Sequence, residues 1–158
     1  MKTQKTILRT VSMLLALSLS MAFGKNPYQA QWTNLEGKPI SLFHDKKPVL
    51  FDFWASWCVP CRASIPSLNQ IAQKIPGLNV VGVNADDPGD LEMARKFIKK
   101  TGMSYPSILD IPDKISEPLE VDVLPTLILI DTDGKELGRW IGEPENFQEI
   151  LTKLIQKK

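Results

Sequence analysis

Two kinds of hydrophobic pattern alternate along the chain. Compact apolar runs predict strands that are buried in the middle of a sheet, and the first of these runs contains a single acid, Asp52. Apolar residues spaced three and four positions apart predict helices that bury one face. The strands are expected at 48–54, 78–84, 107–109, 126–130 and 136–141. The helices are expected at 59–74, 88–101 and 144–156.

Turn signals set the order of these elements. Asp133-Gly134 predicts a tight hairpin between the last two strands, and a turn at 36–39 predicts a short hairpin within residues 28–44. Residues 113–120 are expected to form one or two helical turns. A βαβ unit is thus followed by a further αβ pair, a hairpin and a closing helix. This order predicts one α/β domain whose mixed sheet is covered by helices on both faces.

The N-terminal segment differs from the rest of the chain. Three basic residues precede an uncharged apolar run at 11–23. Small residues occur at the end of this run and directly after it, at Ser20, Ala22 and Gly24. The run is shorter than the roughly 20 residues that cross a bilayer and suits a secretory signal peptide. An uncleaved anchor and a core helix are the alternatives. We expect a signal peptide at 1–24 and a single domain at 25–158, soluble after cleavage, in the bacterial periplasm or on the outer face of the membrane.

The composition suits one globular domain: 158 residues, of which 43% are hydrophobic and 23% are charged. Nineteen Lys and Arg residues oppose eighteen Asp and Glu residues, so the formal net charge is +1. The chain therefore lacks the strong positive field that holds nucleic acid or anionic lipid. These polyanions are not expected as partners.

The sequence contains two cysteines, Cys58 and Cys61, between a predicted strand and a predicted helix. In an exported protein a structural disulfide usually joins distant segments, whereas a loop this small restricts the unfolded chain little. At a helix N-terminus the free N–H groups and the dipole favour a thiolate, which lowers the pKa of the thiol below about 8.5. We expect Cys58 to be exposed and to attack, and Cys61 to point toward the sheet and resolve the mixed disulfide.

Other uses of a cysteine pair stay open at this point. A structural zinc site needs further ligands, and the sequence holds no second cysteine pair and only one histidine. Copper carriage is the stronger rival because thiolates suit Cu(I). An inert local disulfide is the third alternative. We expect redox chemistry, with no metal or other cofactor.

The segment Trp54-Ala-Ser-Trp-Cys-Val-Pro-Cys61 resembles the active site of thioredoxin-fold proteins, and Leu124-Pro125-Thr126 resembles their cis-proline loop. The signal peptide, the N-terminal hairpin and an extra αβ insertion at about 87–112 resemble the exported branch typified by TlpA and ResA. The resemblance implies a thioredoxin-like fold and a thiol-disulfide oxidoreductase that acts on cysteine-containing proteins. It also implies that Pro125 is cis and lies beside the disulfide.

The resemblance supplies candidates for substrate contact. The backbone at Leu124 would present a strand-like edge beside Pro125. Trp57 is a candidate for the protein-facing surface or for packing, and Val59 and Pro60 are candidates beside it. Ser64 is a departure, because ResA-like proteins carry a glutamate at the matching place. This weakens an assignment to apocytochrome c as the substrate.

Asp52 is the candidate base. An acid inside a buried strand is costly to ionise, so its pKa should rise, and it could take the proton of the resolving thiol. The alternative is a side chain that points to solvent or caps a turn. The dipeptide between the cysteines contains no histidine to stabilise the Cys58 thiolate. Together with Asp52, this favours a reductase, which the family implies is recharged by a membrane thiol electron donor.

Overall fold

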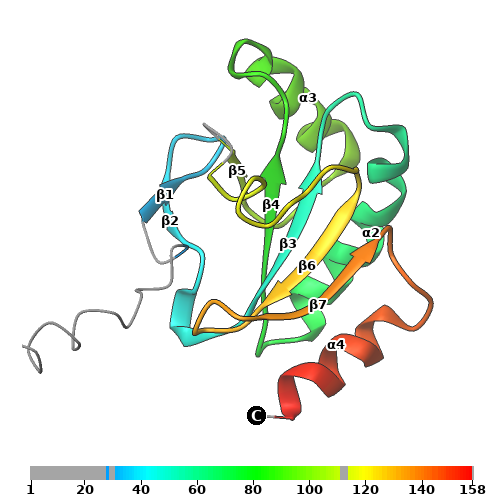
Figure 1. The fold of residues 1–158 in the computed structure, drawn as a ribbon. Coiled ribbons are helices and arrows are strands. Elements are labelled where there is room, and N and C mark those ends of the chain that lie inside the picture. Colours follow the sequence, from blue (N-terminus) through cyan, green and yellow to red (C-terminus); the bar gives the residue numbers. More distant parts are fainter. Residues whose placement is uncertain (1–27, 29–30, 111–113, 158) are drawn as a thin grey trace, which may run out of the picture.

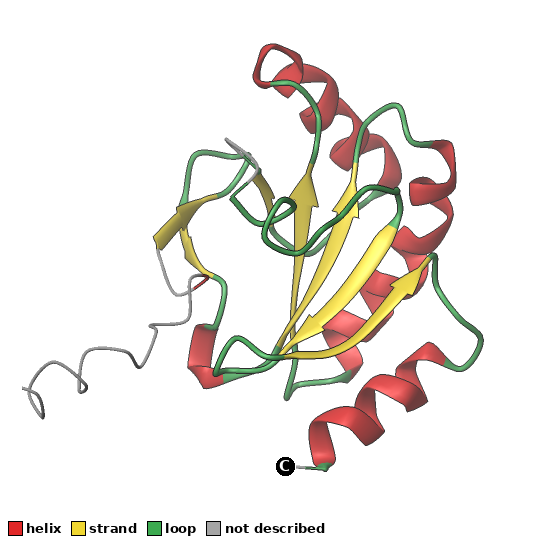
Figure 2. Ribbon diagram, viewed as in Figure 1, coloured by secondary structure: helices red, strands yellow, loops and turns green. Residues whose placement is uncertain are grey.

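The computed structural model describes Tyr28 and residues 31–110 and 114–157; the predicted signal peptide at 1–24 lies outside these residues. A five-stranded mixed sheet, in the order β5-β4-β3-β6-β7, forms the centre of the molecule (Figures 1 and 2). Its central strand β3 runs parallel to β4 and antiparallel to β6. The strands are β3 (Val49–Trp54), β4 (Asn79–Asn84), β5 (Ser107–Leu109), β6 (Thr126–Ile130) and β7 (Glu136–Ile141).

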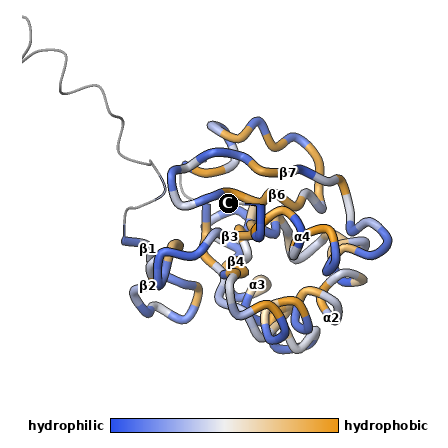
Figure 3. The backbone as a smooth tube through the Cα atoms, turned by 90° about the horizontal axis from the view of Figure 1, so that it is seen from below, coloured by the Kyte–Doolittle hydropathy of each residue, from blue (hydrophilic) through white to orange (hydrophobic). Residues whose placement is uncertain are grey.

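Three α-helices pack against one face of this sheet. They are α2 (Val59–Lys74), α3 (Leu91–Thr101) and α4 (Phe147–Gln156). Apolar side chains from all three helices join one cluster with Leu50 and Trp54 of β3. Figure 3 shows the hydrophobic segments of the sheet between these helices and the N-terminal hairpin.

The opposite face is covered by the hairpin and by turns. The hairpin pairs β1 (Gln31–Thr33) with β2 (Pro39–Ser41), as predicted, and a short 3-10 helix, η2 (His44–Lys46), follows it. Tyr28, Leu42 and Ile115 pack here against Phe51 and Phe53 of β3. Both faces are therefore covered, which explains why every residue of β3 is buried. In the described residues, however, no α-helix covers the second face.

The segment expected to be helical at 113–120 forms hydrogen-bonded turns over its described part, 114–120. Pro118 has no N–H to donate within a helix. The carboxylate of Asp110 accepts the N–H groups of Ile115 and Ser116 at 2.9 and 2.8 Å. These contacts replace the hydrogen bonds that a regular helix would need.

Helix boundaries differ from the predictions at two places. The helix expected from Pro88 begins as a 3-10 turn, η3 (Pro88–Asp90), before α3. The last helix begins at Phe147 rather than at 144, because Asn146 has a φ of 56°. A residue in this left-handed conformation cannot continue a right-handed helix, and asparagine is among the few residues that tolerate it.

The α3–β5 insertion is tied to the hairpin. Leu35 donates its N–H to the Ser107 carbonyl at 2.8 Å, and Arg95 Nε donates to the Leu35 carbonyl at 2.8 Å. The hairpin therefore supports the edge strand β5. Within the described ranges, no helix is long and apolar enough to cross a membrane.

Candidate active site

The two cysteines lie where β3 gives way to α2. Cys58 is the N-cap of α2, and Pro60 lies in the first helical turn, where its missing N–H costs no hydrogen bond. Cys58 and Cys61 form a disulfide, with Cα atoms 5.4 Å apart. The predicted junction of strand, cysteine pair and helix is confirmed.

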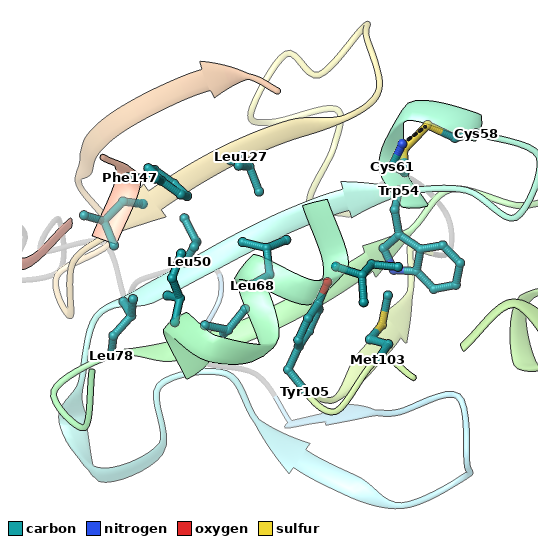
Figure 4. Close-up of a cluster of buried hydrophobic side chains, with 14 of the residues drawn as sticks. Leu50, Trp54, Cys58, Cys61, Leu68, Leu78, Met103, Tyr105, Leu127 and Phe147 are labelled. Atoms are coloured by element: carbon teal, nitrogen blue, oxygen red, sulfur yellow. Dashed lines mark hydrogen bonds between the residues drawn. A yellow bond between two sulfur atoms is a disulfide. The ribbon is translucent and has the colours of Figure 1, made fainter. Parts of the chain in front are cut away.

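The helix N-terminus points a backbone donor at the first sulfur. Cys61 N–H donates to Cys58 Sγ at 3.2 Å (Figure 4). In the dithiol state, the same N–H and the positive end of the helix dipole would stabilise a Cys58 thiolate. The local geometry therefore favours Cys58 as the nucleophile.

The expected exposure of Cys58 is wrong for the disulfide state. Cys58 is 3% exposed and Cys61 1% exposed, because both side chains pack in the cluster that contains Trp54 and Ile65. The neighbours of Cys58 are open instead: Trp57 is 69% exposed and Val59 74%. Two exposed apolar side chains thus flank Cys58 of the buried disulfide.

A buried carboxylate anchors the loop before Cys58. Asp86, which follows β4, accepts the Ser56 N–H with both oxygens, at 3.0 and 2.9 Å. It also accepts the Ser56 hydroxyl at 3.1 Å and the Asn84 amide at 2.8 Å. Sequence reasoning missed this residue, although an acid at the end of a buried strand is a signal for such a role. Asp86 fixes the backbone that presents Trp57 and Cys58.

Asp52 lies inside the sheet, next to α2. It shares a face of β3 with Leu50 and Trp54, whose side chains pack in the same cluster as Cys61 (Figure 4). It is 1% exposed, and burial raises its pKa to about 7. The prediction of a buried acid with a raised pKa is confirmed, and the alternative of a solvent-facing carboxylate is excluded.

Two further side chains, which were not predicted from the sequence, shift the pKa of Asp52. Tyr105 donates its hydroxyl to Asp52 Oδ2 at 2.7 Å, which partly offsets the rise in pKa. The charge of Glu143 raises the pKa of Asp52 further. Glu143 follows β7 and accepts a hydrogen bond from the Ser67 hydroxyl of α2.

The cis-proline expectation is confirmed: the Leu124–Pro125 peptide is cis. The pairing of Phe53 with Thr126 places Pro125 at the end of β3, beside the start of the active-site loop. The Pro125 carbonyl accepts the Gly142 N–H at 2.9 Å, which fixes the loop to the end of β7. Leu124 is half-buried and contacts both core clusters.

The Ser64 side chain makes a hydrogen bond within its own helix. It is buried, and its hydroxyl donates to the Cys61 carbonyl at 3.1 Å, within the first turns of α2. Across the described part of the chain, no group of three or more His, Cys, Asp and Glu side chains is arranged to hold a metal ion. Among the residues that the structure describes, the cysteine pair is therefore not part of such a group.

Comparison with known proteins agrees with this geometry. A family profile described as thioredoxin-like matches residues 45–136, and the chain belongs to this family. It is 37% identical over 141 residues to the thiol-disulfide oxidoreductase ResA of Bacillus cereus, covering 87% of this chain and 79% of the relative. The ResA of Bacillus anthracis is 36% identical over 139 residues, covering 85% and 79%.

Solved structures show the same fold. The thioredoxin domain of a thiol-disulfide oxidoreductase from Bacteroides vulgatus superposes with a TM-score of 0.67 at 26% identity, covering 80% of this chain and 92% of that one. StoA from Bacillus subtilis also gives a TM-score of 0.67, at 23% identity, covering 83% and 98%. Together with the Cys58–Cys61 pair, these relationships make the protein an oxidoreductase of thiols and disulfides, similar to ResA.

Proposed function

We propose that this protein is exported and reduces disulfides in other proteins with the Cys58–Cys61 pair. The observation that carries the proposal is the Cys61 N–H directed at Cys58 Sγ, 3.2 Å away, at the N-terminus of α2. This arrangement favours a thiolate at Cys58. The apolar run at 11–23, behind basic residues, supports export.

The reaction consists of two exchanges. The Cys58 thiolate attacks a substrate disulfide, forms a mixed disulfide and releases the first substrate sulfur as a thiolate. The Cys61 thiolate then attacks Cys58 Sγ, forms the internal disulfide and releases the second substrate sulfur. Two electrons pass from the dithiol to the substrate. The two released sulfurs take up one proton from solvent and one that originated on Cys61.

Asp52 is the proposed acceptor of that Cys61 proton. A base with a pKa of about 7 is well matched to proton transfer near neutral pH. Its position on the face of β3 that packs against α2 supports this role. Protonated Asp52 would later return the proton to the departing substrate thiolate.

The proposed substrate surface consists of the chain neighbours of Cys58 together with the loop at Leu124 and Pro125. Trp57, Val59 and Pro60 are exposed. Half-buried Leu124 and buried Pro125 precede Thr126, which pairs with Phe53 near the end of β3. The exposed apolar side chains of Trp57 and Val59 suit contact with an extended segment of a partly unfolded protein.

The reducing direction follows from what stabilises the two redox states. A strongly oxidising pair needs extra stabilisation of its thiolate, and the Val59-Pro60 dipeptide supplies no charged or hydrogen-bonding side chain. We therefore expect reduction of insulin by the dithiol form and a redox potential well below the roughly −120 mV of a strong oxidant. A potential near that value would contradict the direction. Because the proposed compartment is oxidising, a membrane thiol electron donor would have to recharge the pair.

If the protein carried copper instead, the reduced protein would bind Cu(I) tightly and would exchange disulfides poorly. Two thiolates suit Cu(I), so the reduced protein should be titrated with Cu(I) beside the insulin assay. Tight 1:1 binding with negligible disulfide exchange would favour metal carriage. Rapid exchange with weak binding supports the proposed reductase.

A further inference from the structure

The two oxygens of the Asp52 carboxyl have different surroundings. Oδ2 accepts the Tyr105 hydroxyl at 2.7 Å. Oδ1 is also buried, yet it has no hydrogen-bond partner among the residues that the structure describes. A buried polar atom without a partner is costly, and such atoms are often part of a functional site. One oxygen is thus occupied and the other is available.

The backbone around Tyr105 is fixed on both sides. Asn69 of α2 accepts both the N–H and the hydroxyl of Ser104 at 2.8 Å, and its amide donates to the Gly102 carbonyl at 2.8 Å. On the other side, Gly82 of β4 donates its N–H to the Pro106 carbonyl at 2.9 Å. Tyr105 itself is 5% exposed and lies in the buried cluster with Leu68 and Met103 (Figure 4). Its hydroxyl is therefore held in place by the α3–β5 insertion.

We propose that Tyr105 is a positioning residue that occupies Asp52 Oδ2 and leaves Oδ1 as the oxygen that receives the proton of the Cys61 thiol. This inference rests on the proposed role of Asp52 as the base. In the transfer, the S–H bond of Cys61 breaks and an O–H bond forms at Oδ1, so the thiolate gains the electron pair. The Tyr105 O–H remains intact throughout.

The surroundings of Tyr105 keep its hydroxyl protonated, so that it can donate to Asp52 Oδ2 in both protonation states of Asp52. Burial and the neighbouring Asp52 raise the pKa of Tyr105 well above its ordinary value, so the phenol stays protonated while Asp52 titrates. Besides burial, two ionisable groups shift the pKa of Asp52. They are Tyr105 from the loop before β5 and Glu143 from the loop before α4, whereas Cys61 of α2 is the proposed proton donor. Of these, only Tyr105 donates a hydrogen bond to the carboxylate in the disulfide state.

Replacing Tyr105 tests the inference. In the disulfide form, where neither cysteine titrates, carbon-13 NMR of the Asp52 carboxyl reports its pKa directly. Tyr105→Phe removes a hydrogen bond to the ionised form, so the Asp52 pKa should rise by about one unit. The pH at which the rate of mixed-disulfide resolution increases should shift upward by the same amount. Tyr28→Phe, in the opposite core cluster, is the matched control and should shift neither curve.

A second variant covers the case in which Tyr105→Phe does not fold. Tyr28 and Tyr105 are the only tyrosines in the sequence, so 3-fluorotyrosine incorporated into the Tyr28→Phe protein labels position 105 alone. The more acidic phenol donates a stronger hydrogen bond, so the Asp52 pKa should fall. An unchanged Asp52 titration in both variants would overturn the inference, because a purely structural tyrosine would alter only stability.

The double variant separates this inference from the proposed function. If Tyr105 acts through Asp52, Tyr105→Phe should leave the rate profile of an Asp52→Asn protein unchanged. If Asp52→Asn itself resolves mixed disulfides at the normal rate at every pH, the base role fails, and the Tyr105 inference fails with it. If Asp52→Asn is slow but Tyr105→Phe changes neither titration nor rate profile, only the role of Tyr105 is lost.

Discussion

Trp54 and Ser107 are joined across the strand that separates them. Trp54 Nε1 of β3 donates to Ser107 Oγ of β5 at 2.9 Å, passing over Gly82 of the intervening β4. The Trp54 ring also stacks on Phe97 of α3, with centroids 4.8 Å apart. The indole at the start of the active-site loop is therefore fixed by both elements of the α3–β5 insertion.

Gly82→Ala should disrupt this contact. A Cβ at Gly82 would lie 2.7 Å from both Ser107 Oγ and Trp54 Nε1, so both side chains must move. We expect a loss of about 1–3 kcal/mol in the free energy of unfolding, measured with urea. Gly89→Ala is the matched control, because its Cβ would meet nothing within 4 Å. Equal stability of the two variants would contradict this account of Trp54.

Asp86→Ala should loosen the loop before Cys58. It leaves the Ser56 N–H without its acceptor, which costs about 1–3 kcal/mol when the group stays shielded from water. Disulfide exchange should slow because the backbone that presents Cys58 is no longer fixed. The neighbouring Asp87 is exposed and makes no capping bond, so Asp87→Ala serves as the control. Identical melting curves and rates for the two variants would argue against the anchor.

Substitution of single cysteines should separate their roles. Cys61→Ser should accumulate mixed disulfides through Cys58, because the attacking sulfur remains and the resolving sulfur is gone. Cys58→Ser should trap far fewer partners. Non-reducing electrophoresis followed by mass spectrometry of the captured proteins gives both the yield and the substrates. Equal trapping by the two variants would reverse or abolish the assignment.

Asp52→Asn should slow resolution of the mixed disulfide mainly above neutral pH. With a pKa of about 7, Asp52 is ionised and able to accept a proton only on the alkaline side. We expect a loss of about tenfold at pH 8, less than the roughly hundredfold or more that is typical of general-base catalysis, because solvent also deprotonates the thiol. Below pH 6 the two proteins should react at similar rates. Single-turnover kinetics across this range tests the role, and parallel profiles at all pH values would remove it.

The same substitution should stabilise the oxidised protein at alkaline pH. Folding raises the pKa of Asp52 from 3.8 to about 7, so the folded state holds its proton more tightly than the unfolded state. Stability from this group is full below about pH 4 and is lost as the pH rises through 7. The loss is on the order of 4 kcal/mol, from the difference between the two pKa values. Urea unfolding of Asp52→Asn should therefore show a gain at pH 8 that disappears at pH 4.

Local patterns were enough to place most of the secondary structure. All five strands of the central sheet begin and end within one residue of their predicted positions, because buried apolar runs between turn residues have few alternative conformations. The start of α4 was misplaced by three residues. The pattern alone did not show that Asn146 is left-handed. Hydrophobic periodicity identifies the buried face of a helix, whereas its first residue depends on one backbone angle.

The active site likewise has features that the sequence predicts and contacts that only the tertiary structure shows. A redox pair could be predicted because Cys58 and Cys61 are close in the chain and stand at the start of a helix. A carboxyl with a raised pKa could be predicted because Asp52 lies inside a buried apolar run. The partners of that chemistry come from distant segments: Tyr105 lies 53 residues after Asp52, and Asp86 lies 30 residues after Ser56. Only tertiary packing decides these contacts and the shelter of the disulfide, because they depend on how separate elements meet and not on spacing along the chain.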